Sequence, residues 1–221
     1  IASTRKAFGI EDVEITPYTA VTKVRPGQLR EDAEALPGVR LIDPSVVSPT
    51  FEQSQQLRGY YRFNDVLDVD RYIIDGAETD AVVAARELDT TRLADQNWNN
   101  VHTVYTHGYG LVAAYGNRRQ ASGEPEWIAR DLPPQGELGE FEGRIYFGEL
   151  SNQFVIVGRE EGQDPIEFDT PGGGAEGREG YNVYEGTGGV PMGDFLSRAV
   201  FATRFMDINI LLSDRVNSAS K

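Results

Sequence analysis

The sequence predicts an α+β fold in which antiparallel β-hairpins are combined with several packed helices. Short β-rich runs flank turn dipeptides at Asp75-Gly76 and Ser151-Asn152, a pattern typical of hairpins. Helical signals lie in separate segments, at about 48–60, 94–105 and 194–206. Hairpins interspersed with helices, without regular strand–helix alternation, favour α+β over a parallel α/β sheet.

The chain length is sufficient for one globular domain with its own core. Its 221 residues are 39% hydrophobic and 25% charged, values typical of globular rather than disordered chains. A chain of this size buries enough surface to fold without a metal or a disulfide. We expect residues 1–9 to form the end of a helix, and residues 10–221 to form a single α+β domain with a mobile glycine-rich loop at 162–193.

In the first half of the chain, residues 10–24 alternate weakly between apolar and polar and predict one or two short strands. A polar helix is expected at 28–35 and a short strand at 39–42. Ser48 and Pro49 fit the N-cap and the first position of a helix that runs to about Tyr60, because proline has no N–H to leave unsatisfied there. Strands at 69–74 and 81–88 are expected to form a hairpin around Asp75-Gly76.

In the second half, a helix is predicted by apolar spacings of 4, 3 and 4 at Ala94, Trp98, Val101 and Tyr105. Gly108 and Gly110 follow it. Strands are expected at 111–115 and near 127–129, and a second hairpin at 144–148 and 154–158. The last predicted helix begins at Asp194 and carries a broad apolar stripe to Met206.

Charge and cysteine content exclude several classes of function. The formal net charge is −14 and the pI is about 4.6, so the surface repels nucleic-acid backbones and anionic headgroups. The sequence contains no cysteine, which excludes disulfides, a thiolate nucleophile and cysteine-ligated metals. Glycine-rich stretches such as PGGG and GTGG lack the Gly-Lys-Ser/Thr ending of a phosphate-binding loop. We therefore expect no nucleic-acid partner, no metal and no cofactor.

Both histidines, His102 and His107, lie in the segment NWNNVHTVYTHGYG. A helical zinc site requires histidines four residues apart, whereas these are five apart, about 140° around a helix. We therefore expect structural roles: His102 as a hydrogen-bonded residue at the edge of the Trp98/Tyr105 stripe, and His107 as a helix C-terminal cap.

A family resemblance is found in four stretches of the sequence, which are NWNNVHTVYTHGYG, RLIDPSVVSPTFEQSQQLRGYYRFNDVLDVDRYIIDG, RELD and RIYFGE. These stretches resemble the UPF0182 family of bacterial multi-pass membrane proteins, whose activity is not characterised. The resemblance extends from about Thr4 to Ser213. It implies that this chain is a segment of a longer protein and lies on the outer face of the cytoplasmic membrane, tethered by helices upstream.

We expect a non-enzymatic role, as an assembly or ligand-recognition module. The expected partners are the membrane-spanning part of the same chain and an envelope or small-molecule ligand, and a homo-oligomer is left open. Aromatic side chains are suited to ligand stacking, and the candidates are Trp98, Tyr105 and Tyr109.

Two alternatives remain. In one, the chain is a cell-envelope hydrolase or transferase that uses the Trp98–Gly110 segment. His102 or His107 would then be the general base, with Glu87 or Glu149 as acid or orienting group. In the other, the acidic surface concentrates cations near a channel mouth.

Overall fold

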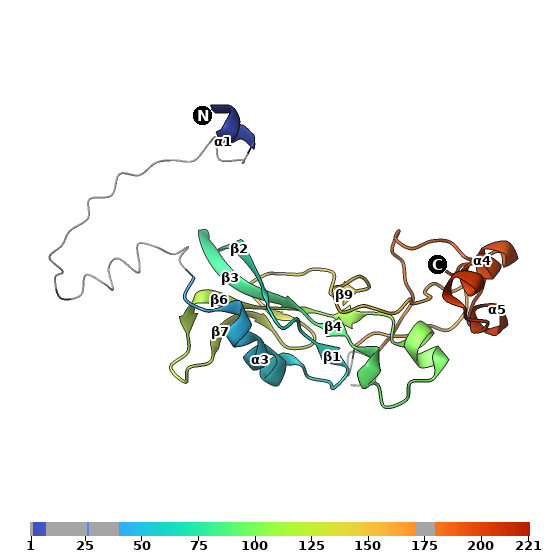
Figure 1. Ribbon diagram of the computed structural model, residues 1–221. Coiled ribbons are helices and arrows are strands. Elements are labelled where there is room, and N and C mark those ends of the chain that lie inside the picture. The colour runs from blue at the N-terminus through green and yellow to red at the C-terminus, as the bar shows by residue number, and fades with distance from the viewer. Residues whose placement is uncertain (1, 8–25, 27–39, 171–179) are drawn as a thin grey trace. The chain divides into compact units, whose positions relative to one another are not determined.

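The computed structural model describes residues 2–7, 26, 40–170 and 180–221. The chain divides into two compact units, Ile1–Leu36 and Pro37–Lys221. In the first unit, helix α1 (Ala2–Ala7) lies within the segment predicted to end a helix. The strands predicted within 10–24 and the helix at 28–35 fall outside the described residues. The rest of the description concerns the second unit (Figure 1).

A five-stranded antiparallel sheet forms the centre of the second unit, in the order β2-β3-β6-β7-β8. Its strands are β2 (Asp68–Ile74), β3 (Ala77–Ala85), β6 (Leu111–Arg119), β7 (Pro125–Arg130) and β8 (Gln135–Gly136). The predicted hairpin around Asp75-Gly76 is confirmed as β2–β3. Both turn residues have positive φ, 51° and 77°, as the favoured two-residue hairpin turn requires.

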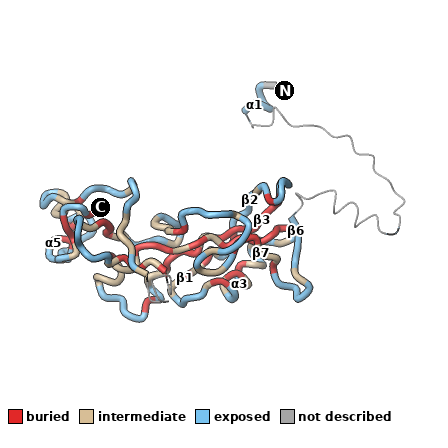
Figure 2. The backbone as a smooth tube through the Cα atoms, turned by 180° about the vertical axis from the view of Figure 1, so that it is seen from behind, coloured by how far each residue is buried: buried red, intermediate tan, exposed pale blue. Residues whose placement is uncertain are grey.

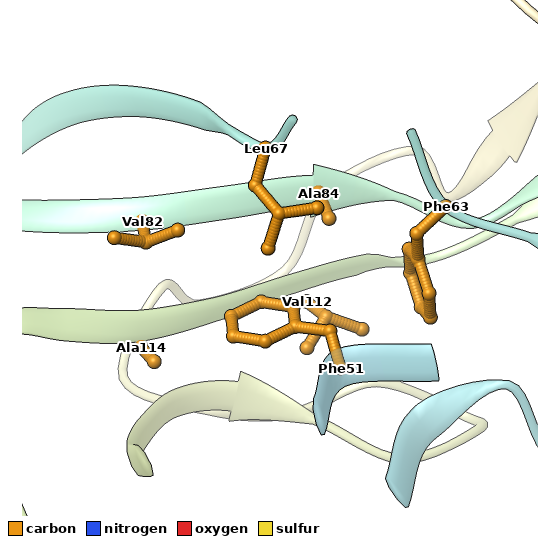
Figure 3. Close-up of a cluster of buried hydrophobic side chains, with 7 residues drawn as sticks. All are labelled: Phe51, Phe63, Leu67, Val82, Ala84, Val112 and Ala114. Carbon is orange, nitrogen blue, oxygen red and sulfur yellow. The ribbon is translucent and has the colours of Figure 1, made fainter. Parts of the chain in front are cut away.

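Helix α3 (Pro44–Gln55) packs on one face of this sheet. Figure 3 shows Phe51 of α3 directed at side chains of the central strands β3 and β6. Its ring also makes an edge-to-face contact with Trp127 at 4.8 Å between centroids. The side chains of this core cluster alternate along each strand, as expected when one sheet face is buried; they are Phe51, Phe63, Leu67, Val82, Ala84, Val112 and Ala114.

The opposite face of the sheet is also buried. Its cluster comprises Ile74, Ala81, Val83, Ala113, Tyr115, Ile128 and Ala129. Leu138, in the segment that follows β8, packs against it. Because both faces of β3 are covered, five of its residues from Ala81 to Ala85 read as a continuous apolar run rather than an alternating one.

The predicted start and end of helix α3 are wrong. The helix begins at Pro44, where Asp43 is the N-cap and accepts a hydrogen bond from the Ser45 amide at 2.9 Å. Asp43 and Pro44 therefore occupy the N-cap and the first helical position, which were predicted at Ser48 and Pro49. The helix ends before Leu57, which has a φ of 60°. No strand forms in described residues 40–42, although the Leu41 and Ile42 amides both donate to the Gly116 carbonyl.

The hairpin predicted at 144–148 and 154–158 is wrong. Strand β9 (Arg144–Ile145) pairs instead with β5 (Gly108–Tyr109), far away in sequence. In the other predicted arm, Val157 exchanges two backbone hydrogen bonds with Lys221. Two more short pairs complete the strands, β1 (Tyr61–Arg62) with β4 (Glu87–Leu88), and β10 (Glu167–Phe168) with β11 (Tyr181–Asn182). The last pair lies within the predicted loop at 162–193, of which residues 171–179 are outside the described part.

The helix predicted at 94–105 is shorter than expected. A 3₁₀ turn, η1 (Thr90–Arg92), precedes it, and the helical residues centre on a π-type turn, η2 (Asn100–Val104). The Tyr105 amide donates to the Asn100 carbonyl at 2.9 Å, five residues back. A wide turn of this kind changes the helical phase and is frequent at functional sites, so the 4, 3, 4 spacing does not describe one regular face.

The C-terminal helices are α4 (Phe195–Phe205) and α5 (Asn209–Leu212). The predicted start at Asp194 is confirmed, because its carboxylate accepts from the Ser197 amide at 2.9 Å. The two helices pack with Ile156, Met192 and Val216 in a third core cluster. In the second unit they lie at the end away from the β2–β3 turn, and exposed residues are frequent around them (Figure 2).

Candidate functional site

The His102 ring is hydrogen-bonded to the backbone and packed against aromatic rings. Its Nδ1 lies 2.8 Å from the Phe154 carbonyl, which can only accept, so Nδ1 carries the proton. The ring stacks on Phe154 at 4.0 Å between centroids, and Trp98 lies 5.3 Å away on a tilted plane. These contacts are those expected of a hydrogen-bonded residue at the edge of the Trp98/Tyr105 stripe.

His107 does not cap a helix through its ring, so that prediction is wrong. Thr106 Oγ1 donates its one proton to Glu167 Oε2 at 3.1 Å, so it accepts from His107 Nδ1 at 2.9 Å. His107 Nε2 lies 3.4 Å from Asp169 Oδ1, a distance at the limit of a hydrogen bond. The side chain is fully buried, so these two contacts fix the ring in place.

Asp169 joins His107 to a guanidinium. Arg144 donates to both of its carboxylate oxygens, at 2.7 and 3.1 Å, and also to Glu142 at 3.1 Å. Burial alone would raise the pKa of Asp169, but the hydrogen bonds from His107 and Arg144 outweigh burial and lower it below 3.8. The pair therefore contributes stability above that pH, which is lost as the pH falls through the depressed pKa.

Glu167 is the centre of the polar network and is 1% exposed. One carboxylate oxygen accepts from Thr106 Oγ1 and from the Tyr146 hydroxyl at 2.9 Å. The other accepts from the Tyr184 amide at 3.0 Å and the Gly158 amide at 3.4 Å. Burial and the neighbouring Glu167 raise the pKa of Tyr146. With four donors directed at it, this carboxylate is satisfied as a structural acceptor.

Glu87 and Glu149, the candidate acid or orienting groups, lie together. The buried Glu87 accepts from the backbone amides of Glu149 and Leu150 at 3.1 and 2.8 Å. Glu149 accepts from the Asn64 side chain at 2.9 Å. Within the described residues, no hydrogen bond joins either glutamate to either histidine, and no group of three His, Asp or Glu side chains is arranged to hold a metal ion.

The three aromatic candidates for ligand binding have different packing roles. Trp98 Nε1 donates to Asp207 at 2.6 Å, which ties it to the α4–α5 region. Tyr105 packs between Tyr60 and Phe168, with centroids 5.2 and 5.3 Å away. Tyr109 lies under the Arg144 guanidinium at 5.9 Å. None of the three lines the pocket beside α4 and α5.

That pocket, called the apolar pocket below, has a volume of about 440 Å³. Its walls come from the segment 146–157, from 184–192 and from α4 and α5. Its apolar wall residues include Phe147, Phe154, Val190, Met192, Phe201 and Phe205. Tyr146, whose hydroxyl binds Glu167, is also in the wall, so the polar network supports one side of the pocket.

A second surface feature is the α4–α5 face, defined as Phe195, Leu196, Val200, Phe205, Met206, Ile208 and Leu212. These seven large apolar side chains are between 41% and 91% exposed. Isolated exposed apolar residues are ordinary, but a dense group marks an interaction surface. The buried side of α4 is formed by Ala202.

Comparison with known proteins identifies the family. A profile of the uncharacterised protein family UPF0182 matches residues 1–221. This chain belongs to the UPF0182 family. It is 43% identical over 221 residues to the UPF0182 protein of Leifsonia xyli subsp. xyli. It is 46% identical over 224 residues to that of Bifidobacterium adolescentis, and 48% over 224 residues to that of Kineococcus radiotolerans. No solved structure matches.

The whole of this chain is matched in each of these UPF0182 relatives, but it spans only 20–22% of their length. The described helices of the chain are too short or too polar to cross a membrane. UPF0182 is an uncharacterised family, so membership gives no reaction.

Glu167, Asp169 and Arg144 were not among the site residues predicted from the sequence. Glu167 and Asp169 are two residues apart, a spacing that places side chains on one face of a strand, and this was the available signal. This spacing was a weak signal because residues 162–193 were predicted to form a loop. Their partners Thr106 and Tyr146 are 61 and 21 residues away in the chain, so no local pattern shows the network of this UPF0182 chain.

Substituting His102 by alanine is expected to lower the free energy of unfolding by about 2 kcal/mol, since it removes a ring stack and the hydrogen bond to the Phe154 carbonyl. Urea denaturation measures the change. Excess Zn²⁺ should leave the melting temperature of the unsubstituted protein unchanged. A zinc-dependent rise that His102→Ala abolishes would contradict the structural role.

Proposed function

We propose that this chain is an extracytoplasmic portion of an integral membrane protein and acts there as an assembly module. Its α4–α5 face packs against the remaining part of the same polypeptide, including the membrane-spanning part. The observation that carries the proposal is the density of exposed apolar side chains on two short helices, seven within residues 195–212.

The arrangement of these side chains favours a helix-sized or larger partner. Leu196 and Val200 are four residues apart on α4, so both lie on one side of that helix. Ile208, the N-cap of α5, and Leu212, its last residue, are also four apart. Met206, at the left-handed end of α4, is 91% exposed. Fully burying one such side chain contributes about 1.5–3 kcal/mol, so a partner that covers several of them gains substantial affinity.

Two observations favour the same polypeptide as the partner. The relatives are about five times as long as this chain, which covers 20–22% of them. A covalently connected partner also needs little intrinsic affinity, because its effective concentration is high. The net charge of −14 opposes docking on anionic lipid, so the membrane surface itself is the less suitable partner.

The test compares two triple variants in the longer protein, purified in detergent. One is Leu196→Gln, Val200→Gln and Leu212→Gln on the α4–α5 face. The control is Leu41→Gln, Val66→Gln and Ile73→Gln, whose side chains are 74%, 63% and 72% exposed elsewhere in the same unit. We expect the first to lower the melting temperature by several degrees and to increase protease cleavage between the chain and its continuation, and the control to do neither.

Both triple variants should leave the melting of the 221-residue chain unchanged, because the substituted side chains are exposed in it. Equal effects of the two triple variants in the longer protein would contradict the proposal. Loss of a dimer on sedimentation would assign the face to a second copy, and loss of vesicle binding would assign it to lipid.

A further inference from the structure

The apolar pocket is large enough to hold a small molecule, and it shares Phe205 with the α4–α5 face. Phe147 and Val190 in its wall are 77% and 63% exposed. Ile156, Met192 and Ile210, also in its wall, are only 5%, 4% and 1% exposed. The pocket therefore extends from an open apolar mouth to the third core cluster, and its volume of about 440 Å³ falls in the range of ligand sites.

The charge around the pocket is unlike that of the rest of the chain. The sequence has 35 acidic and 21 basic residues. Among the described residues that line the pocket, however, Lys221 is the one charged side chain. Its Nζ donates to the Gly186 carbonyl at 3.0 Å and lies 5.7 Å from the centre of the Tyr184 ring. An ammonium has three donors, so two remain for another acceptor.

We propose that the apolar pocket binds a single-chain anionic amphipath, of which a free fatty acid is the simplest form. The hydrocarbon chain occupies the space between the Phe147 mouth and the Ile156 floor. The carboxylate accepts from the Lys221 ammonium. This occupant fits both properties of the pocket, an apolar wall and the side-chain ammonium of Lys221, because chain burial supplies the affinity and the headgroup supplies the orientation.

The length of the fatty acid's hydrocarbon chain gives the first test. Octanoate, decanoate and dodecanoate are titrated into the protein below their micellar concentrations, with binding followed by calorimetry. We expect one saturable site and a gain in affinity of about fourfold per added methylene until the pocket is full, the ratio that about 0.8 kcal/mol per buried CH₂ gives. Binding that is not saturable, or that does not depend on chain length, overturns the proposal.

The headgroup gives the second test. Decanol should bind about threefold more weakly than decanoate, the size expected for an exposed charge pair. Lys221→Gln should make the two affinities equal. Lys6→Gln, the same charge change at an exposed residue of α1, should leave the preference for decanoate intact. A preference that survives in Lys221→Gln overturns the assigned role of Lys221.

Closing the pocket gives the third test. A Cβ at Gly188 would lie 3.1 Å from the Tyr184 hydroxyl and 3.5 Å from the Phe147 ring, both pocket residues. Gly188→Leu is therefore expected to abolish decanoate binding. Gly59→Leu, where a Cβ meets nothing within 4 Å, is the matched control and should bind normally.

Melting curves of both glycine variants show whether either is unfolded. If Gly188→Leu fails to fold, Phe201→Trp and Phe205→Trp, which enlarge two other wall residues, replace it, and unchanged decanoate affinity in both overturns the proposal. Vesicles of a zwitterionic diacyl phospholipid should not bind. Binding of these vesicles without binding of monomeric decanoate would also overturn it, because the surface would then dock on a membrane.

Discussion

Replacing Glu167 by glutamine is expected to lower the free energy of unfolding by about 3 kcal/mol, although the two side chains are almost the same size. The carboxylate accepts four hydrogen bonds, two on each oxygen. An amide nitrogen donates and cannot accept, so one pair of donors is left unsatisfied in a site that is 1% exposed. Each orphaned buried donor costs about 1–3 kcal/mol. Urea denaturation at constant m-value measures the loss.

A pH series distinguishes this network from a general loss of packing. The pKa of Tyr146 is raised above 10, first by burial and then by Glu167. A phenol with a raised folded pKa keeps its proton when the unfolded state has lost it, so stability falls as the pH rises above 10. Glu167→Gln removes the second cause, and the alkaline decline should become shallower.

Glu185→Gln, at an exposed position, is the control for Glu167→Gln and should change stability by less than about 0.5 kcal/mol. Equal losses in the two glutamate variants, or an unchanged alkaline slope in Glu167→Gln, would show that the carboxylate is not the centre of the network.

Elements with strong local signals were predictable from the sequence. The β2–β3 hairpin follows from two β-rich runs around Asp75-Gly76, a turn whose positive φ values suit aspartate and glycine. Helix α4 follows from Asp194 and the apolar stripe after it. In both, the residues that define the element are neighbours in the chain, so sequence alone contains the necessary information.

Elements that depend on distant partners were not predictable. Strand β9 pairs with β5, and the hydrogen bond from the Gly110 amide to the Gly143 carbonyl at 2.7 Å continues the contact. Nothing within residues 144–158 shows this partner. The start of α3 was misplaced for a different reason, since Asp43-Pro44 and Ser48-Pro49 are both acceptable caps and the structure uses the first.

The candidate site was predicted less well than the fold. Residue type drew attention to His102 and His107, yet the network around His107 is organised by Glu167, which lies in a segment interpreted as loop. The importance of a buried carboxylate comes from its desolvation and its partners, and both are properties of the folded chain. The part of the α4–α5 face that lies on α4, by contrast, was visible as a broad apolar stripe that ends at Met206.

Arg86→Ala is expected to lower the free energy of unfolding by about 4 kcal/mol, the other large effect in this structure. Arg86 is 0% exposed and donates to the Gln55 and Tyr109 carbonyls at 2.8 and 2.9 Å. Within the described residues, no carboxylate forms an ion pair with it, and its remaining terminal nitrogen has no partner. Alanine would leave two buried carbonyls unsatisfied and open a cavity between α3 and β5.

Arg86→Met separates packing from charge. Burial lowers the pKa of Arg86 to about 10, so holding the charged guanidinium in the protein interior costs free energy that methionine does not. Methionine also fills most of the volume beside Phe63, whose ring centre lies 5.8 Å from the guanidinium carbon. We therefore expect Arg86→Met to cost only about 1 kcal/mol, because relief of desolvation offsets most of the two lost hydrogen bonds.

Paired urea titrations measure both Arg86 variants, with Arg71→Met as the control. Arg71 is 60% exposed and pairs with Glu78 at 3.1 Å, so its loss should cost less than about 0.5 kcal/mol. If Arg86→Met is as damaging as Arg86→Ala, the guanidinium hydrogen bonds rather than the filled volume stabilise this junction of α3, β3 and β5. In that case the charge is a required part of the fold.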